Sequence, residues 1–372
     1  MRLFLQSIFG QVFLNAFIIW RGYQVLRPKK IGRIIFVLFF AIEMLLYFTG
    51  YFFHKDLPDS ILFPVMAVCN TWYIASFLIA VGLLGVDLAR VVIRNVGRKS
   101  IKARVSILLP KLFVVYLIFV AGVMVKSYYN AMYPVVRHLD IHIPKTVEGK
   151  DSLTIVLMSD LHIGETIGKR HIRRFVELCN AEHPDLILIG GDLMDYESTR
   201  AEKECIEEEL QRLNAPLGVY MILGNHEYRA NRNAKIRWFE KTGGILLVDS
   251  VVMPDSTFYL IGRDDIINAN RASLESLLQG VDMEKPVIVL EHRPTFARDV
   301  IDNQCDLGLY GHTHHCQYWP FSFFLRFIFE FPYGYFSERD SHIYVTSGIG
   351  FTGPPYRIGT RSELAVLRLR FN

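Results

Sequence analysis

Five short segments in the second half of this 372-residue chain carry side chains that bind metal ions or transfer protons. They hold Asp160 and His162, then Asp192 and Asp195, then Asn225 and His226, then His292, and finally His312 and His314. Carboxylate, imidazole and amide oxygen together suit borderline divalent metals such as Mn, Fe, Zn or Co. One Asp-x-His pair is common by chance, whereas five such segments in one region are not. The pattern predicts a metal centre and disfavours the alternative of scattered polar loop residues.

Each of these segments follows a short apolar run that reads as a β-strand. The predicted strands before the five segments are 153–158, 186–189, 219–223, 287–290 and 307–310, with further strands at 343–346 and 364–369 and helices at 171–180 and 201–213. Alternate residues of an extended segment share a face, so Asp160 and His162 point the same way, as do His312 and His314. In α/β folds, sites assemble at the carboxyl ends of the strands. We therefore expect the five segments to meet at one edge of a sheet.

As a set, the segments resemble the signature of the calcineurin-like metallophosphoesterases, which reads D-x-H, G-D-x-x-D, G-N-H-[DE], H and G-H-x-H. In the same order, the chain has Asp160-Leu-His162, Gly191-Asp192-Leu-Met-Asp195, Gly224-Asn225-His226-Glu227, His292 and Gly311-His312-Thr-His314. The resemblance runs from about residue 153 to the C-terminus. It implies an α/β domain of two mixed β-sheets between layers of helices, an αββα arrangement.

A narrower resemblance is to the membrane-linked branch that contains YkuE-like phosphoesterases. Its members share a late segment like Ser347-Gly348-Ile349-Gly350 followed by Pro355, Arg357 and Glu363. They usually read G-H-T-H-G-G-Q, where this chain has His315 and Cys316 before Gln317. The departure leaves the ligands intact and adds bulk and an imidazole beside them, which bears on substrate preference.

The resemblance also implies roles for individual residues. One metal ion would be held by Asp160, His162, Asp192 and His314, and a second by Asp192, Asn225, His292 and His312, with Asp192 shared. A hydroxide bridging the two divalent ions would attack phosphorus. His226 would protonate the leaving oxygen and Asp195 would orient His226. Arg263, Arg293 and His315 are candidate contacts for substrate, and so are Tyr228 and Arg229 after the third motif.

The first third of the chain is predicted to be membrane-embedded. Apolar segments cover about 3–20, 31–53, 61–86 and 107–125, and each approaches or exceeds the ~20 residues that cross a bilayer as a helix. A soluble bundle would show polar helix faces, and these segments barely do. A cleaved signal peptide at the first segment is disfavoured by Asn15 and by Trp20-Arg21, which lacks a small-residue cleavage site. We expect four helical spans in residues 1–127, a linker at 128–150 and the metallophosphoesterase domain at 151–372.

The charges of the loops predict the topology. Basic residues concentrate after the first and third spans, at Arg21, Arg27, Lys29, Lys30 and Arg33, and at Arg90, Arg94, Arg98, Lys99, Lys102 and Arg104. Between them, the second loop has Lys55, Asp56 and Asp59. The positive-inside rule places the first and third loops in the cytoplasm. We therefore expect a multi-pass protein of a bacterial inner membrane whose metal domain lies outside the cytoplasm.

Three functions are compatible with these patterns. The favoured one is a membrane-anchored phosphoesterase acting on a phosphoester or pyrophosphate of a lipid or envelope component. A second is UDP-2,3-diacylglucosamine pyrophosphatase activity in lipid A synthesis, whose cytosolic-facing substrate conflicts with the expected topology. A third is a non-catalytic metal-binding sensor or scaffold, which would not need His226 and Asp195. An aromatic segment at 317–336 is either core or a membrane-interface segment. The net charge of +4 without a dense basic face argues against nucleic acid as a partner.

Overall fold

The computed structural model describes residues 2–372 except 26–29, 54–56, 97–98 and 197. Of the residues used to predict the topology, Arg27, Lys29, Lys55, Asp56 and Arg98 lie outside the described residues. The chain divides into two compact units, Met1–Lys126 and Ser127–Asn372. Each unit is described below by itself.

Long helices build the first unit: α1 (Arg2–Val25), α2 (Lys30–Phe52), α3 (Asp59–Val96) and most of α4 (Lys99–Met132). In the described part of the chain, three segments are long and apolar enough to cross a membrane: Lys30–Gly50, Ser60–Asn95 and Lys111–Met132. Helix α1 covers the first predicted span but is not among them. Its sequence includes the polar residues Gln11 and Asn15.

Those polar residues of α1 pack against the carboxylate of Glu43 on α2. Gln11 Nε2 donates to Glu43 Oε1 at 3.1 Å, and Asn15 Nδ2 donates to Oε2 at 2.6 Å. Trp72 Nε1 of α3 donates to Asn15 Oδ1 at 2.9 Å. A buried polar group is costly unless it is hydrogen-bonded, so this cluster ties α1, α2 and α3 together.

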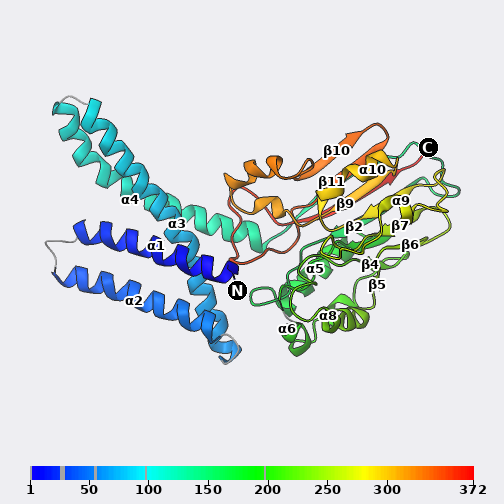
Figure 1. Ribbon diagram of the computed structural model, residues 1–372, viewed down its shortest axis with the longest axis horizontal. Helices are drawn as coiled ribbons and strands as arrows, with labels where there is room; N and C mark the ends of the chain where they lie inside the picture. The colour runs from blue at the N-terminus through cyan, green and yellow to red at the C-terminus, as the bar shows by residue number, and fades with distance from the viewer. Residues whose placement is uncertain (1, 26–29, 54–56, 97–98, 197) are drawn as a thin grey trace. The chain divides into compact units, whose positions relative to one another are not determined.

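Two six-stranded sheets form the second unit (Figure 1). The first has the order β1 (Val135–His142), β12 (Glu363–Arg370), β2 (Ser152–Met158), β3 (Leu186–Ile189), β4 (Val219–Met221) and β5 (Ile245–Leu246). The second has the order β10 (Gly334–Glu338), β11 (Ser341–Val345), β9 (Leu307–Tyr310), β8 (Val287–Leu290), β7 (Tyr259–Gly262) and β6 (Ser250–Val252). Strands β2, β3, β4 and β5 run parallel, as do β7, β8, β9 and β11. Their carboxyl ends therefore share one edge of each sheet.

Alternate side chains along a strand point to opposite faces of its sheet, so each sheet has an apolar layer on both faces. Strand β2 is the clearest case, because its Ile155 and Leu157 join the apolar core between the sheets, where Leu290 and Leu309 of the second sheet also lie. Val156 and Met158 point to the opposite side. Such a period of two is what a strand buried on both faces requires.

Helices cover the outer face of each sheet. On the first sheet lie α5 (Lys169–Ala181), α6 (Thr199–Lys203), α7 (Glu207–Leu210) and α8 (Arg232–Phe239), and on the second lie α9 (Leu274–Leu277) and α10 (Arg298–Asp302). The result is the expected αββα arrangement. The predicted helix 201–213 is two short helices, with Cys205 between them at φ 48°, a left-handed conformation that interrupts an α-helix.

The predicted linker at 128–150 is wrong. Its first residues complete α4, and residues 135–142 form β1, which pairs in parallel with β12 along its whole length. The strand escaped sequence analysis because Arg137, His138 and Asp140 interrupt its apolar pattern. As an edge strand it tolerates these charges, since its outer face meets solvent.

Candidate metal centre

The predicted ligands lie immediately beyond the carboxyl ends of β2, β3, β4, β8 and β9. Backbone turns there bring the side chains back over the sheet edge. Asp160, His162, Asp192, His312 and His314 all have positive φ, between 49° and 67°. A non-glycine residue in this region is strained, and such strain is concentrated at functional sites.

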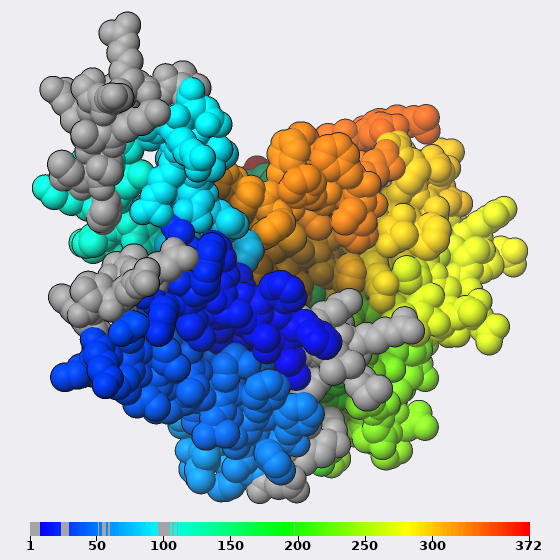
Figure 2. Space-filling model, turned by 60° about the vertical axis from the view of Figure 1, so that its left-hand side comes forward, coloured from blue at the N-terminus to red at the C-terminus, as the bar shows by residue number. Residues whose placement is uncertain are grey.

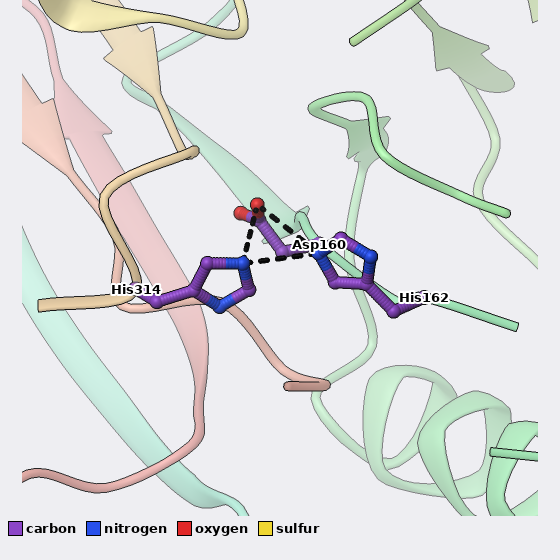
Figure 3. A group of neighbouring side chains, drawn as sticks. All are labelled: Asp160, His162 and His314. Atoms are coloured by element: carbon purple, nitrogen blue, oxygen red, sulfur yellow. Dashed lines mark hydrogen bonds and ion pairs between the residues drawn. The ribbon is translucent and has the colours of Figure 1, made fainter. Parts of the chain in front are cut away.

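Asp160, His162 and His314 form one group of potential ligands (Figure 3). His314 Nε2 lies 3.3 Å from Asp160 Oδ1 and 3.0 Å from His162 Nε2. His162 Nε2 is 3.9 Å from the same carboxylate oxygen. All three side chains are buried. Three donor atoms that converge on one point in this way suit a cation.

Asp192, His292 and His312 form a second group. His292 Nε2 lies 3.2 Å from Asp192 Oδ2. The same Asp192 oxygen is 3.8 Å from His162 Nε2 in the first group. Asp192 thus faces both groups, which is the position of a carboxylate shared by two ions.

Asn225 supplies a direct test of whether a metal fits here. Its side chain is 4% exposed, and its Oδ1 is buried with no hydrogen-bond partner among the described residues. A buried amide oxygen left unpaired costs ~1–3 kcal/mol. Coordination to a divalent ion would satisfy that oxygen, so the residues present fit the metal.

The electrostatics of the second group agree with this fit. Burial lowers the pKa of His312 to about 3, and the nearby charges of His292 and Arg293 act in the same direction. His312 is therefore a neutral imidazole, the form that binds metal. Burial alone would lower the pKa of His292, but the charge and hydrogen bond of Asp192 outweigh it and raise the pKa to about 10. Asp192 therefore favours positive charge at His292 Nε2, and a metal ion bound there would have to displace the proton.

Several buried groups hold the ligands in place. His292 Nδ1 donates to the Gly190 carbonyl at 2.7 Å, which leaves Nε2 for the metal. Ser159 Oγ donates to Asp160 Oδ2 at 2.7 Å. Each contact fixes the orientation of one ligand.

Glu227 and Arg357 organise the loops that carry the ligands. The Glu227 carboxylate accepts the backbone N–H groups of Asp192, Met194 and Gly224 at 2.9, 3.1 and 2.7 Å. The fully buried Arg357 donates to the carbonyl oxygens of His314, Ser347 and Gly350 at 3.0, 2.6 and 2.8 Å. Both residues belong to the motifs, Glu227 to G-N-H-[DE] and Arg357 to the late segment. Motif position alone does not reveal these contacts, because they also reach Asp192 and His314, which are distant in sequence.

His226 and Asp195 lie together beside the first group. His226 Nδ1 is 2.7 Å from Asp195 Oδ1 and 3.1 Å from the Asp195 carbonyl oxygen. Burial raises the pKa of Asp195, but the hydrogen bonds of His162 and His226 outweigh it and leave the pKa well below its usual range. On the other side of the ring, Arg229 Nη1 lies 2.7 Å from His226 Nε2. His226 is thus held between a carboxylate and a guanidinium.

The candidate substrate contacts fare differently. Arg263 is buried and pairs with Glu291 at 3.0 Å and Asp299 at 3.4 Å, so the expectation that it meets substrate is wrong. Arg293 Nε donates to Asp265 Oδ2 at 3.0 Å. Arg293 lies near His312, because its charge helps to lower the pKa of that histidine. His315 stacks on Tyr333 with ring centroids 4.0 Å apart. Sequence alone does not separate a buried arginine in an ion pair from one that faces a ligand.

Known proteins resemble this chain in sequence. Residues 153–316 match the family described as calcineurin-like phosphoesterase. A transmembrane protein with metallophosphoesterase domain from Danio rerio is 30% identical over 365 residues, with 92% of this chain and 81% of that protein covered. An uncharacterized metallophosphoesterase of Helicobacter pylori is 26% identical, with 92% and 91% covered. The metallophosphoesterase YkuE of Bacillus subtilis is 27% identical, with 64% and 90% covered.

The geometry and the comparisons lead to the same assignment. Two groups of potential metal ligands meet at Asp192, and His226 lies beside them against Asp195. The likeness to the Danio rerio protein extends over the apolar helices as well as the metal centre. The chain is a membrane protein and belongs to the family of calcineurin-like metallophosphoesterases.

Proposed function

We propose that this protein hydrolyses a phosphoester or pyrophosphate bond of a lipid or cell-envelope component at the extracytoplasmic surface of a membrane. The observation that supports the reaction most strongly is the position of Asp192 Oδ2 between His162 and His292. One carboxylate facing two ligand groups provides for two ions a few ångströms apart, the arrangement used for in-line displacement at phosphorus.

Two bound divalent ions would supply an activated water and neutralise charge on the phosphoryl group. Asp160, His162, Asp192 and His314 would hold one ion, and Asp192, Asn225, His292 and His312 the other. The other contributions to the reaction come from residues of the protein. Buried walls around Asp160 and Asp192 exclude bulk water and strengthen each electrostatic contact.

His226 is placed to give a proton to the leaving oxygen from Nε2. Asp195 fixes the ring through Nδ1, which lies 2.7 Å from Asp195 Oδ1. In the structure Arg229 Nη1 donates to Nε2, so Arg229 must move away and Nε2 must take up a proton from solvent before it can protonate the leaving oxygen. The guanidinium is then free to bind a phosphoryl oxygen.

The membrane location is supported by the three apolar segments and by the charges of the loops. Lys111–Met132 ends at the second unit, so that unit is tethered where the segment leaves the bilayer. Basic residues between α1 and α2 and between α3 and α4 favour an extracytoplasmic second unit. Fusion of alkaline phosphatase to the C-terminus tests this topology, because the reporter is active only outside the cytoplasm. If alkaline phosphatase is inactive at the C-terminus, while a reporter that works only in the cytoplasm is active there, the UDP-diacylglucosamine substrate is favoured instead.

The reaction is tested with purified full-length protein in nanodiscs. Its metal content is measured, and hydrolysis is screened with p-nitrophenyl phosphate, bis-p-nitrophenyl phosphate and a bacterial lipid extract. We expect two bound ions and release of phosphate from a lipid. Asn225→Ala should lose the second ion, and His226→Ala should keep both and lose rate. Two bound ions without hydrolysis of any compound would support the sensor instead.

A further inference from the structure

An exposed aromatic face follows the metal-binding histidines. It consists of Trp319, Phe323, Phe324, Phe327 and Ile328, and their exposed fractions are 66%, 49%, 53%, 70% and 70%. The three phenylalanines lie on the 3₁₀ helix Phe321–Phe327. Figure 2 shows the orange part of the chain, which contains this helix, at the molecular surface. A core segment would bury these rings, so that alternative for residues 317–336 is wrong here.

The exposed rings form one ordered cluster. Phe323 lies 5.8 Å from Phe324 and 6.0 Å from Phe327 between ring centroids, and Arg326 stacks over Phe323 at 3.4 Å. Leu325 points the other way and is buried. Contiguous exposed apolar surface of this kind marks a binding site for a protein or a membrane.

Both ends of the segment are attached to the metal centre. At its start, the Gln317 backbone N–H donates to the His314 carbonyl at 3.1 Å. At its end, the Phe329 ring lies 6.1 Å from the His312 ring, and Thr313 Oγ1 donates to the Pro332 carbonyl at 2.9 Å. The segment that carries the aromatic face is therefore anchored at both ends to residues 312–314.

One loop, which contains Arg357 and Ile358, contacts both the aromatic segment and the end of the last apolar segment, Lys111–Met132. On one side, Arg357 N donates to the Ser127 carbonyl at 2.9 Å, and Asn130 Nδ2 donates to the Arg357 carbonyl at 3.1 Å. On the other side, Trp319 N donates to the Ile358 carbonyl at 2.7 Å. Ser127 and Asn130 belong to the final turns of Lys111–Met132. Residues 357 and 358 thus join the start of the aromatic segment to residues 127–130.

We propose that the aromatic face inserts into the membrane interface and holds the metal centre against the phosphate of a lipid headgroup. Aromatic side chains favour the interface, and an interfacial helix buries its apolar face ~5–10 Å into the headgroup and acyl boundary. The positive charge of Arg326 adds an electrostatic attraction to anionic headgroups. Membrane insertion stands on the contacts above, and the lipid substrate rests on the proposed function.

Photo-crosslinking of the full-length protein tests insertion without any need for activity. p-Benzoylphenylalanine replaces Phe324 or Phe327, and the protein is irradiated in nanodiscs of phosphatidylethanolamine and phosphatidylglycerol. Mass spectrometry should find lipid adducts at both positions. Ile245, 50% exposed on the edge strand β5 at the end of the sheet farthest from β1, is the control position and should give none. Adducts to a second copy of the chain, or equal lipid labelling at 245, would overturn the proposal.

A matched activity measurement tests what the insertion does. The double variant Phe324→Ser/Phe327→Ser is compared with Ile245→Ser on p-nitrophenyl phosphate and on fluorescent phosphatidic acid in the same nanodiscs. We expect the double variant to lose at least about tenfold in kcat/KM on the lipid, or ~1.4 kcal/mol, and less than about twofold on the soluble ester. Equal loss on both overturns the proposal. If the wild type hydrolyses no lipid but gives lipid adducts, the proposed substrate fails and the membrane contact stands.

Discussion

Asp192 Oδ2 lies 3.2 Å from Nε2 of His292, while His162 of the other ligand group faces the same oxygen. This carboxylate is the only link needed to make two metal positions one centre. Replacing Asp192 should therefore affect both metal positions, whereas replacing a ligand of one position should affect that position alone.

Asp192→Asn should weaken binding of both ions, whereas Asn225→Ala should weaken one. Orienting groups around a metal already contribute ~10–100-fold to affinity or activity, so we expect losses above that range for Asp192→Asn. Calorimetric titration with Mn²⁺ distinguishes the variants by stoichiometry. Retention of one full-affinity ion by Asp192→Asn would show that the carboxylate is not shared.

His226→Ala should lower kcat by ~10²–10⁴-fold for esters with poor leaving groups, the usual contribution of a general acid. The loss should be smaller for p-nitrophenyl phosphate, whose leaving oxygen needs no proton. The comparison of p-nitrophenyl with alkyl phosphates measures this difference. Equal losses on both, with metal content unchanged, would assign His226 to substrate positioning instead.

Removal of metal should destabilise the second unit. Asp160, Asp192 and Asp195 place three carboxylates close together around His162, and bound ions relieve their repulsion. Ions present at a thousand times their dissociation constant stabilise the folded state by ~4 kcal/mol. The chain has four tryptophans, of which Trp238 is buried in the second unit. Thermal unfolding followed by tryptophan fluorescence should move to lower temperature with EDTA and recover with Mn²⁺. An unchanged midpoint would contradict metal binding at this centre.

The positions where the chain departs from G-H-T-H-G-G-Q have left-handed backbone. His315 and Cys316 have φ of 48° and 58°, a region that costs an L-residue ~1–2 kcal/mol. Cys316→Gly should therefore raise the free energy of unfolding by about 0.5 kcal/mol, because relief of strain exceeds the added entropy of the unfolded chain. Cys305→Gly, which opens space in the core, serves as control and should be destabilising. Urea unfolding measures both, and a less stable Cys316→Gly would contradict the argument.

Most ligands could be predicted because each one directly follows an apolar strand. The order of Asp160, Asp192, Asn225, His292 and His312 along the chain records the order of strand ends, which is local information. The roles of Glu227 and Arg357 could not be predicted in the same way, because each also contacts a distant loop, at Asp192 and at His314.

Elements at the margins of the sheets were harder to predict. The charges of β1 hide an edge strand, and β5, β6 and β7 are short and were not predicted. Arg263 was misassigned because burial with Glu291 depends on the packing of β7 against β8. Local patterns thus locate the metal centre, while tertiary packing decides which charged residues remain accessible to substrate.

The central claim is that two metal ions at this centre catalyse phosphoester hydrolysis. The most direct test is a titration of metal-free full-length protein in nanodiscs with Mn²⁺, with hydrolysis of p-nitrophenyl phosphate and bis-p-nitrophenyl phosphate measured at each addition. We predict that activity rises to a plateau at about two ions per chain, because Asp192 faces His162 of one group of potential ligands and His292 of another. A plateau at about one ion, or two bound ions without any hydrolysis, would contradict the claim.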